Sequence, residues 1–305
     1  MSTENHGTGF IVAAFAANLG IAVAKFVGFF LTRSSSMLAE AVHSVADTGN
    51  QGLLLLGKHR GQREADATHQ FGYGRERYFW AFVVSVVLFT GGAAFAVFEG
   101  ISKIRHPHPL ESAPIAIGIL VVGLVLEGGS LFTAAKAASS ARGGRSLVRF
   151  IRESRSPELP VVLLEDAAAC IGLILALAGV SLSSATGDPI FDGIATLCIG
   201  LLLGVVAVTL AIKMKRSLIG ESALVEEVDA IRQALVDDPT VVAVIHLRTQ
   251  HLGPEDLLVA AKLAFGPLLT LTEVALAIDA VEARVRAAVP SVRLIYIEPD
   301  LHRSE

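Results

Sequence analysis

The chain has 305 residues, of which 52% are hydrophobic and only 18% are charged, and its mean hydropathy is +0.60. This composition excludes an ordinary soluble domain and indicates a membrane protein. The net charge of −4 gives no reason to expect a nucleic-acid partner.

Six apolar stretches are long enough to cross a bilayer core about 30 Å thick, which takes roughly 20 residues of α-helix. They cover residues 10–31, 36–57, 78–104, 112–137, 160–182 and 189–212. The first is too long for a signal-peptide core, so we expect it to remain as an anchor. The sequence therefore predicts an all-α transmembrane domain of six helices over residues 1–216.

Residues 217–305 change character, because charged side chains follow one another closely and no run is long enough to span. The pattern predicts a helix over 222–236, strands over 241–250 and 257–265, a helix over 272–288 and a strand over 292–298. Gly253 and Pro254 separate the first two strands, which is a hairpin signal. This α-β-β-α-β order predicts a small α+β cytoplasmic domain.

Basic residues are distributed unevenly among the loops. The loops after the second, fourth and sixth spans carry Lys58, Arg60, Arg63, Arg75, Arg77, Lys136, Arg142, Arg145, Arg149, Arg152, Arg155, Lys213, Lys215 and Arg216. The opposite loops carry only Arg33, Lys103 and Arg105. Because basic loops stay in the cytoplasm, we expect both termini there and a multi-pass protein of the plasma or inner membrane.

The second span carries ionisable groups where a lipid-facing helix would carry leucine. His43 and Asp47 are four residues apart, so they lie on one helix face and can reach one ion together. A divalent cation would offset the cost of placing them in the membrane. Alternatively, His43 donates to a neighbouring helix and Asp47 pairs with Lys25.

The fifth span opens with two adjacent acids, Glu165 and Asp166. Consecutive helical residues point about 100° apart, so one acid can face a cavity squarely and the other only obliquely. Alternatively, the span starts later and both acids lie in headgroup water. The apolar residues before the pair favour the first interpretation.

Several motifs resemble the cation diffusion facilitator family of metal/proton antiporters: HSVADTGNQ, HQFGYGRERYFWAFVVSVVLF and EGISKI, followed by a soluble tail after six spans. HSVADTGNQGLLLLG and RESRSPELPVVLLEDAAA more narrowly resemble the branch that contains the ninth vertebrate zinc transporter and its bacterial relatives.

The resemblance implies a transport site made by two residues four apart in the second span and two in the fifth. His43, Asp47 and Asp166 match it, but the position four before Asp166 is Val162. Glu165 is our candidate for the fourth ligand, with water as the alternative. We therefore expect a metal site of His43, Asp47, Asp166 and Glu165.

One imidazole with carboxylates suits zinc first, and also manganese, iron(II) or cobalt, as the transported substrate; no organic cofactor is expected. Ligands must be deprotonated to bind metal, so protons and metal compete and a metal/proton antiporter is predicted. Nothing resembles a nucleotide-binding loop. We expect no enzyme activity, since no HExxH or comparable arrangement appears. A non-transporting metal sensor or scaffold of the same fold is the alternative.

Other polar residues in the spans have a structural interpretation as well as a functional one. Glu127 either supports the metal ligands or relays protons, or it is a carboxylate bonded to Ser130 or to a nearby helix. Glu40 either lines the access path or lies near the interface, and Glu99 with Lys103 is expected to be a structural pair. Close helix packing is expected at Gly91, Gly92, Gly128 and Gly129.

The resemblance also implies that the cytoplasmic domain forms a homodimer and can bind metal. His246 and Glu298 match part of the family's cytoplasmic metal site, but Lys262 and Tyr296 replace residues between them. Metal binding in this domain is therefore a weaker expectation than metal binding in the membrane.

Overall fold

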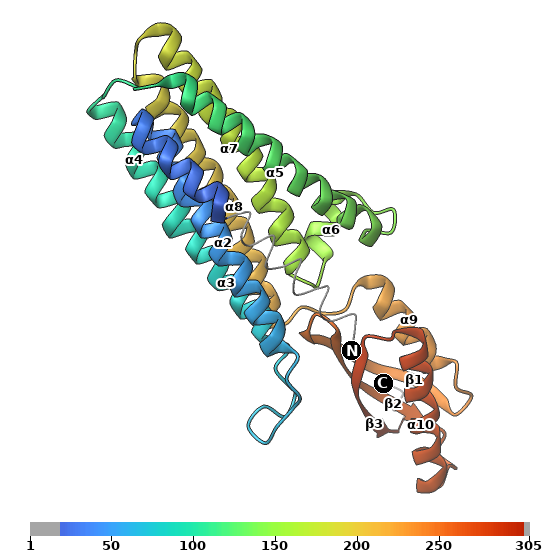
Figure 1. The fold of residues 1–305 in the computed structure, drawn as a ribbon. Helices are drawn as coiled ribbons and strands as arrows, with labels where there is room; N and C mark the ends of the chain where they lie inside the picture. The colour runs from blue at the N-terminus through green and yellow to red at the C-terminus, as the bar shows by residue number, and fades with distance from the viewer. Residues whose placement is uncertain (1–18, 302–305) are drawn as a thin grey trace, which may run out of the picture. The chain divides into compact units, whose positions relative to one another are not determined.

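The structure is a computed structural model that describes residues 19–301 (Figure 1). The chain forms two compact units, one of residues up to Gly57 together with Trp80–Met214, and one of Lys58–Phe79 together with the residues from Lys215 onward. The predicted first span lies partly outside the described residues, and its described part is the helix Leu19–Thr32.

The first unit is entirely helical, which confirms the predicted all-α class. Its elements are α2 (Ser35–Gly61), α3 (Glu76–Val87), the π-helix η1 (Leu88–Ala94), α4 (Phe95–Arg105), α5 (Ala113–Ala141), α6 (Leu147–Glu153), α7 (Glu158–Thr186) and α8 (Ile190–Ile219). Within residues 19–301, four helices are long and apolar enough to cross a membrane, namely Glu76–Arg105, Ala113–Ser140, Glu158–Thr186 and Ile190–Ile219. Helix α2 has 27 residues but is more polar, because it carries the site residues.

The π-helix η1 interrupts the third predicted span next to the polar residues of α2. A Cβ at Gly92 would lie 3.2 Å from Leu203 Cδ1 of α8 and 4.0 Å from His43 Nδ1 of α2. The predicted packing role is therefore confirmed for Gly92. For Gly91, Gly128 and Gly129 it stays a prediction, because a Cβ there would meet no atom of residues 19–301 within 4 Å.

Asp192, at the start of α8, joins this helix to α2 at one end of the unit. Its carboxylate accepts hydrogen bonds from Ser34 Oγ (2.8 Å), the Ser35 amide (2.7 Å) and the Ser36 amide (3.3 Å). These amides belong to the first turn of α2, where helical N–H groups have no partner within the helix. The buried carboxylate therefore caps α2 and fixes it to α8.

Glu99 and Lys103 of α4 join the same end, but not as the predicted pair. Ser35 Oγ donates to Glu99 Oε1 (2.8 Å), and Lys103 Nζ donates to the carbonyl of Arg33 (3.2 Å). The structure therefore gives both side chains partners on the α2 segment, because α4 lies against it.

The second unit contains α9 (Val225–Val236), β1 (Val241–Gly253), β2 (Asp256–Phe265), α10 (Leu271–Ala288) and β3 (Val292–Asp300). This order confirms the predicted α-β-β-α-β pattern. The sheet has the order β1-β2-β3, with β1 and β2 antiparallel and β2 and β3 parallel. Both helices cover one face, where Leu257, Val259 and Leu263 pack on Ile231 and Val281.

The segment between α2 and α3 belongs to this second unit. Gly74 and Gly253 approach so closely that a Cβ on Gly253 would lie 2.8 Å from the Gly74 Cα, and Arg77 pairs with Glu255 (3.5 Å). Within the segment, the Tyr73 hydroxyl donates to Asp66 Oδ2 (2.6 Å). This bond, with backbone amides of the segment, lowers the pKa of Asp66 to about 2.

Candidate metal centre

The two predicted ligands of α2 lie together inside the helix bundle. His43 is 1% exposed, and its Nε2 lies 3.4 Å from Oδ2 of Asp47, one turn further along. Neither ring nitrogen of His43 nor Oδ1 of Asp47 has a hydrogen-bond partner within residues 19–301. Buried polar atoms are normally paired, so unpaired imidazole and carboxylate atoms on one face suit a cation.

The two predicted ligands of α7 are also buried, which favours a span that begins before them. Asn50 Nδ2 of α2 donates to Glu165 Oε1 (2.8 Å), and Ser130 Oγ of α5 donates to Asp166 Oδ2 (2.7 Å). The adjacent acids therefore face different neighbours, as their angular separation on a helix predicts.

The bond from Asn50 to Glu165 brings α2 and α7 into direct contact. Asp47 is close enough to Glu165 and Asp166 for the carboxylates to interact electrostatically. Within the described part of the chain, however, no three His, Cys, Asp or Glu side chains come close enough to hold one ion. The structure thus places the four predicted ligands in one region as two pairs, one on each helix.

Lys25 forms an ion pair with Glu40 and not with Asp47. Its Nζ lies 3.1 Å from Glu40 Oε2 and donates to Ser44 Oγ at 2.7 Å, and both charged side chains are fully buried. Gly172 of α7 makes room for the carboxylate, because a Cβ there would collide with Glu40 Oε1. The alternative in which Lys25 neutralises Asp47 by a direct ion pair is therefore wrong.

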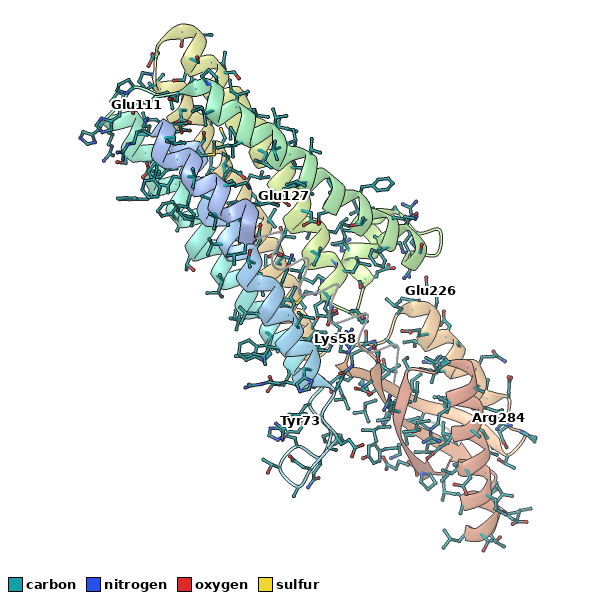
Figure 2. All side chains as sticks on the ribbon, in the orientation of Figure 1. Lys58, Tyr73, Glu111, Glu127, Glu226 and Arg284 are labelled. Atoms are coloured by element: carbon teal, nitrogen blue, oxygen red, sulfur yellow. The ribbon has the colours of Figure 1, made fainter. Side chains whose placement is uncertain are left out.

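Glu127 and Val162 complete the surroundings of the α7 acids. Figure 2 shows Glu127 midway along α5. Ser130, which sequence reasoning offered as its partner, donates to Asp166 instead. Val162 packs in the apolar cluster around Phe150 and Leu163, so the missing ligand position is filled by a hydrophobic contact.

The candidate site in the cytoplasmic unit holds a lysine where the chain departs from the family pattern. His246, Lys262 and Glu298 are neighbours in register across β1, β2 and β3. Lys262 Nζ lies 3.0 Å from Glu298 Oε1 and 2.9 Å from Asp300 Oδ2. Hydrogen bonds that Lys262 donates to Asp300 and Glu298 raise the pKa of its ammonium group, which neutralises the acids of this row.

Sequence reasoning missed Ser44 as a partner of Lys25 and Asp192 as the partner of the start of α2, and it assigned Ser130 to Glu127 instead of Asp166. Asp192 carried a usable signal, because an acid inside an apolar span requires a partner, and three consecutive serines, Ser34 to Ser36, stand where the second span begins. Ser44 and Ser130 carried none, since the rotation of their helices decides whom they meet.

Comparison with known proteins agrees with this arrangement. Residues 11–219 match the description "Cation efflux transmembrane domain", and residues 224–300 match "Cation efflux protein, cytoplasmic domain".

Similar curated proteins include the mouse and human "Proton-coupled zinc antiporter SLC30A9, mitochondrial", each 37% identical over 231 residues, which is 75% of this chain and 41% of each relative. "Metal tolerance protein C4" of Arabidopsis thaliana is 28% identical over 86% of this chain and 58% of its own length. "Magnetosome protein MamB" of Magnetospirillum gryphiswaldense is 25% identical over 92% of this chain and 89% of its own length.

The chain thus spans about two-fifths of the length of the SLC30A9 relatives, with 41% of each covered. The family match covers both units and includes every candidate ligand of α2 and α7. The chain belongs to the cation efflux family, whose members are multi-pass membrane transporters and not enzymes.

Proposed function

We propose that this protein exchanges a divalent metal cation for protons across a membrane. His43, Asp47 and Asp166 are the proposed ligands, with Glu165 as the fourth. Zinc is the first choice of substrate, and manganese, iron(II) and cobalt are the others, because the donors are one imidazole and carboxylates.

The observation that carries this proposal is the contact between α2 and α7 at their buried polar residues. Asn50 joins Glu165, and one to two turns away on α2 one oxygen of Asp47 and the ring nitrogens of His43 have no partner within residues 19–301. Intramembrane ionisable groups usually mark an ion pathway, because the membrane makes them costly to keep. A doubly charged ion between the helices would satisfy both pairs.

Proton coupling follows from the chemistry of the same donors. Imidazole and carboxylate bind metal only in their deprotonated forms, so a proton on either group displaces the ion. The relatives named proton-coupled zinc antiporters support this choice of coupling and of substrate.

Glu165 can serve as the fourth ligand through its second carboxylate oxygen, because the bond from Asn50 goes to Oε1. Val162 lies four residues before Asp166 on the same helix and packs in an apolar cluster. A modest rotation of α7 that directs Glu165 and Asp166 toward Asp47 would therefore move Val162 as well. We propose this movement as the step that forms the loaded site.

The remaining parts of the proposal concern the whole protein. Residues 1–216 form the transport domain and residues 217–305 the cytoplasmic domain, with both termini in the cytoplasm and the protein in the plasma or inner membrane. The protein acts as a homodimer, supported by the match of residues 224–300 to the family's cytoplasmic domain.

The test is uptake of zinc, manganese, iron(II) and cobalt into proteoliposomes that contain a pH dye. We expect zinc uptake with release of protons, and loss of both in Asp47→Ala and Asp166→Ala. The control is Asp188→Ala, which removes an exposed acid that caps α8 by accepting from the Ile190 amide. Loss in Glu165→Ala as well would identify the fourth ligand, and retention would leave three protein ligands.

Metal flux that ignores a pH gradient would overturn the exchange mechanism. Binding without any flux would favour the alternative function, a membrane metal sensor or scaffold, because Val162 leaves the family ligand set incomplete.

A further inference from the structure

Helix α6 lies in the basic segment that connects α5 to α7. Residues 136–155 carry six basic side chains and one acid, Glu153. The acid pairs with Arg149 (2.8 Å) and with Arg145 (3.6 Å), and the basic side chains of the segment outnumber its acid six to one. Ser146 caps α6 by accepting from the Arg149 amide (3.2 Å).

The inner face of α6 is fixed to the transmembrane helices. Phe150 is buried against Ala134 and Ala138 of α5 and Leu163 of α7. Phe150 therefore lies between these two helices, one to two turns from Ser130 and Asp166, which join them.

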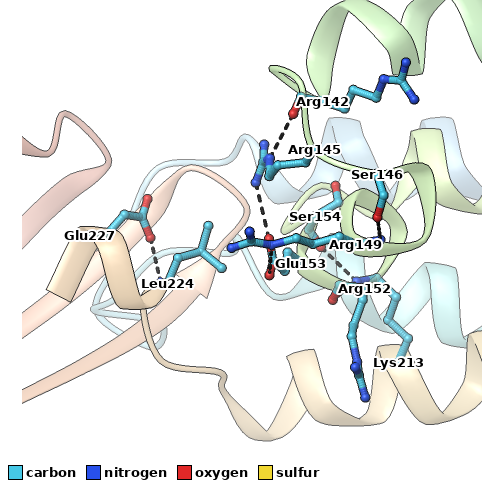
Figure 3. A network of polar contacts seen from close by, with 10 residues as sticks. All are labelled: Arg142, Arg145, Ser146, Arg149, Arg152, Glu153, Ser154, Lys213, Leu224 and Glu227. Atoms are coloured by element: carbon cyan, nitrogen blue, oxygen red, sulfur yellow. Dashed lines mark hydrogen bonds and ion pairs between the residues drawn. The ribbon is translucent and has the colours of Figure 1, made fainter. Parts of the chain in front are cut away.

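The end of α6 is held by α8. Lys213 Nζ donates to the carbonyls of Arg152 (3.1 Å) and Ser154 (3.0 Å), as Figure 3 shows. A cation at these carbonyls satisfies the C-terminal end of the helix. The packing of Phe150 and the hydrogen bonds from Lys213 together fix the position of α6 against the transmembrane helices.

The outer face of α6 combines apolar and basic side chains. Val148 is 78% and Leu147 39% exposed, and Arg149 and Arg152 are exposed beside them. Figure 3 shows Arg149 and Arg152 on α6 with Arg145 beside them. Because α5 ends at Ala141 and α7 begins at Glu158, the short helix lies at the level where membrane-spanning helices leave the hydrocarbon.

We infer that the outer face of α6 binds anionic phospholipid headgroups. Leu147 and Val148 enter the boundary between headgroups and acyl chains, and Arg149 and Arg152 contact the phosphates, as in interfacial helices with one apolar and one basic side. The charge complementarity selects an anionic lipid over a zwitterionic one. This inference does not depend on which ion the protein carries.

The test uses a tryptophan on α6 in the full-length protein. Val148→Trp is combined with Trp80→Phe, which removes the only native tryptophan, and the protein is reconstituted with brominated phosphatidylglycerol or brominated phosphatidylcholine at equal mole fractions. We expect stronger quenching by the anionic lipid, and a smaller difference at high salt.

Arg149→Gln and Arg152→Gln should each reduce the preference for phosphatidylglycerol about five-fold, since a basic side chain near an anionic surface contributes about 1 kcal/mol. The matched control is Arg105→Gln, an exposed arginine at the opposite end of the transmembrane helices, which should change nothing.

A second measurement needs no tryptophan replacement. Native mass spectrometry of the otherwise unaltered chain, released from equal amounts of both lipids, should retain phosphatidylglycerol preferentially, and Arg149→Gln with Arg152→Gln should abolish the preference. Equal quenching by both lipids, no quenching by either, or unchanged lipid retention in the arginine variants would overturn the inference.

Discussion

At the residue scale, Lys25 and Glu40 form an ion pair next to His43 that is closed to solvent. Removing one partner leaves an uncompensated charge, which typically costs ~3–5 kcal/mol. We therefore expect Lys25→Met to lower the unfolding temperature strongly in detergent. The double variant Lys25→Met with Glu40→Gln should recover most of the loss, because neither charge remains.

The ion pair of Arg286 and Glu282, which lies nearer the surface, is the comparison for the variants of Lys25 and Glu40. Surface pairs contribute about 0–1 kcal/mol, so Arg286→Met should leave the unfolding temperature nearly unchanged. If Lys25→Met behaves like Arg286→Met, the buried pair does not stabilise the fold.

A substitution at Gly172 of α7 tests the ion pair of Lys25 and Glu40 from the neighbouring helix. A methyl group there would displace Glu40 Oε1, whereas at Gly128 it would meet no described atom within 4 Å. Gly172→Ala should destabilise the protein by ~1–3 kcal/mol through overpacking, and Gly128→Ala should be neutral or slightly stabilising. Thermal unfolding of both variants measures the difference, and equal unfolding temperatures would contradict the close contact.

The residues of the candidate site were partly predictable. His43, Asp47, Glu165 and Asp166 stand out in sequence because acids and imidazole are costly in a membrane. Their hydrogen-bond partners do not stand out, since serine and asparagine occur in membrane helices for many reasons. The choice of Glu40 over Asp47 by Lys25 depends on helix rotation, which hydropathy does not specify.

At the element scale, the first turn of α2 depends on Asp192. Replacement of Asp192 by Ala leaves several buried donors unpaired, at ~1–3 kcal/mol each before relaxation. We expect Asp192→Ala to destabilise the protein clearly and to speed hydrogen exchange at the start of α2. Asp188→Ala, which removes an exposed cap of α8, should have a small effect.

In the cytoplasmic unit, Arg284 of α10 pairs with Asp238 in the turn before β1. Partial burial raises the pKa of Asp238, but hydrogen bonds from Thr240 and Arg284 outweigh it and hold the pKa below its usual value. A lowered carboxylate pKa means that the stabilisation is complete above the ordinary pKa of about 3.9 and is lost as pH falls through the folded-state pKa.

Arg284→Met should therefore speed hydrogen exchange in residues 271–288 at neutral pH. The effect should be roughly tenfold, for a charged hydrogen bond of about 1.5 kcal/mol. The difference between the two proteins should shrink in acid, where Asp238 is protonated in both. A difference that persists there would show that Arg284 acts through packing alone.

The boundaries of helices and strands could be predicted where the hydrophobic periodicity or a turn signal was strong. Gly253 and Pro254 lie at the turn between β1 and β2, and β1 begins at the predicted Val241. Helix α6 was missed because seven residues are too few to show a clear period. The π-helix was missed too, since its hydropathy is that of the surrounding span.

At the scale of the whole molecule, metal binding should stabilise the folded chain. A ligand at about 100 times its dissociation constant adds ~2.7 kcal/mol, so zinc should raise the unfolding temperature of the wild type. The increase should fall as pH is lowered, because protons compete for the ligands. Asp47→Ala and Asp166→Ala should lose it, and a zinc effect that survives both would place the metal elsewhere.

The assignment of residues 58–79 to the same compact unit as the sheet was not predicted. The segment reads as a basic loop between spans, and nothing in its composition distinguishes a loop that packs on a domain from one in water. The contact of Gly74 with Gly253 involves backbone atoms, which leave no side-chain pattern to recognise.

The parallel pairing of β2 with β3 has a consequence for biosynthesis. Strand β2 is central in the sheet, and its partner β3 is translated only after the crossover helix α10. Until then one backbone edge of an apolar strand is open, which is the condition under which nascent chains associate wrongly. A released chain that ends between Ala288 and Val292 would therefore present this open edge to chaperones or proteases, however well the earlier helices have inserted.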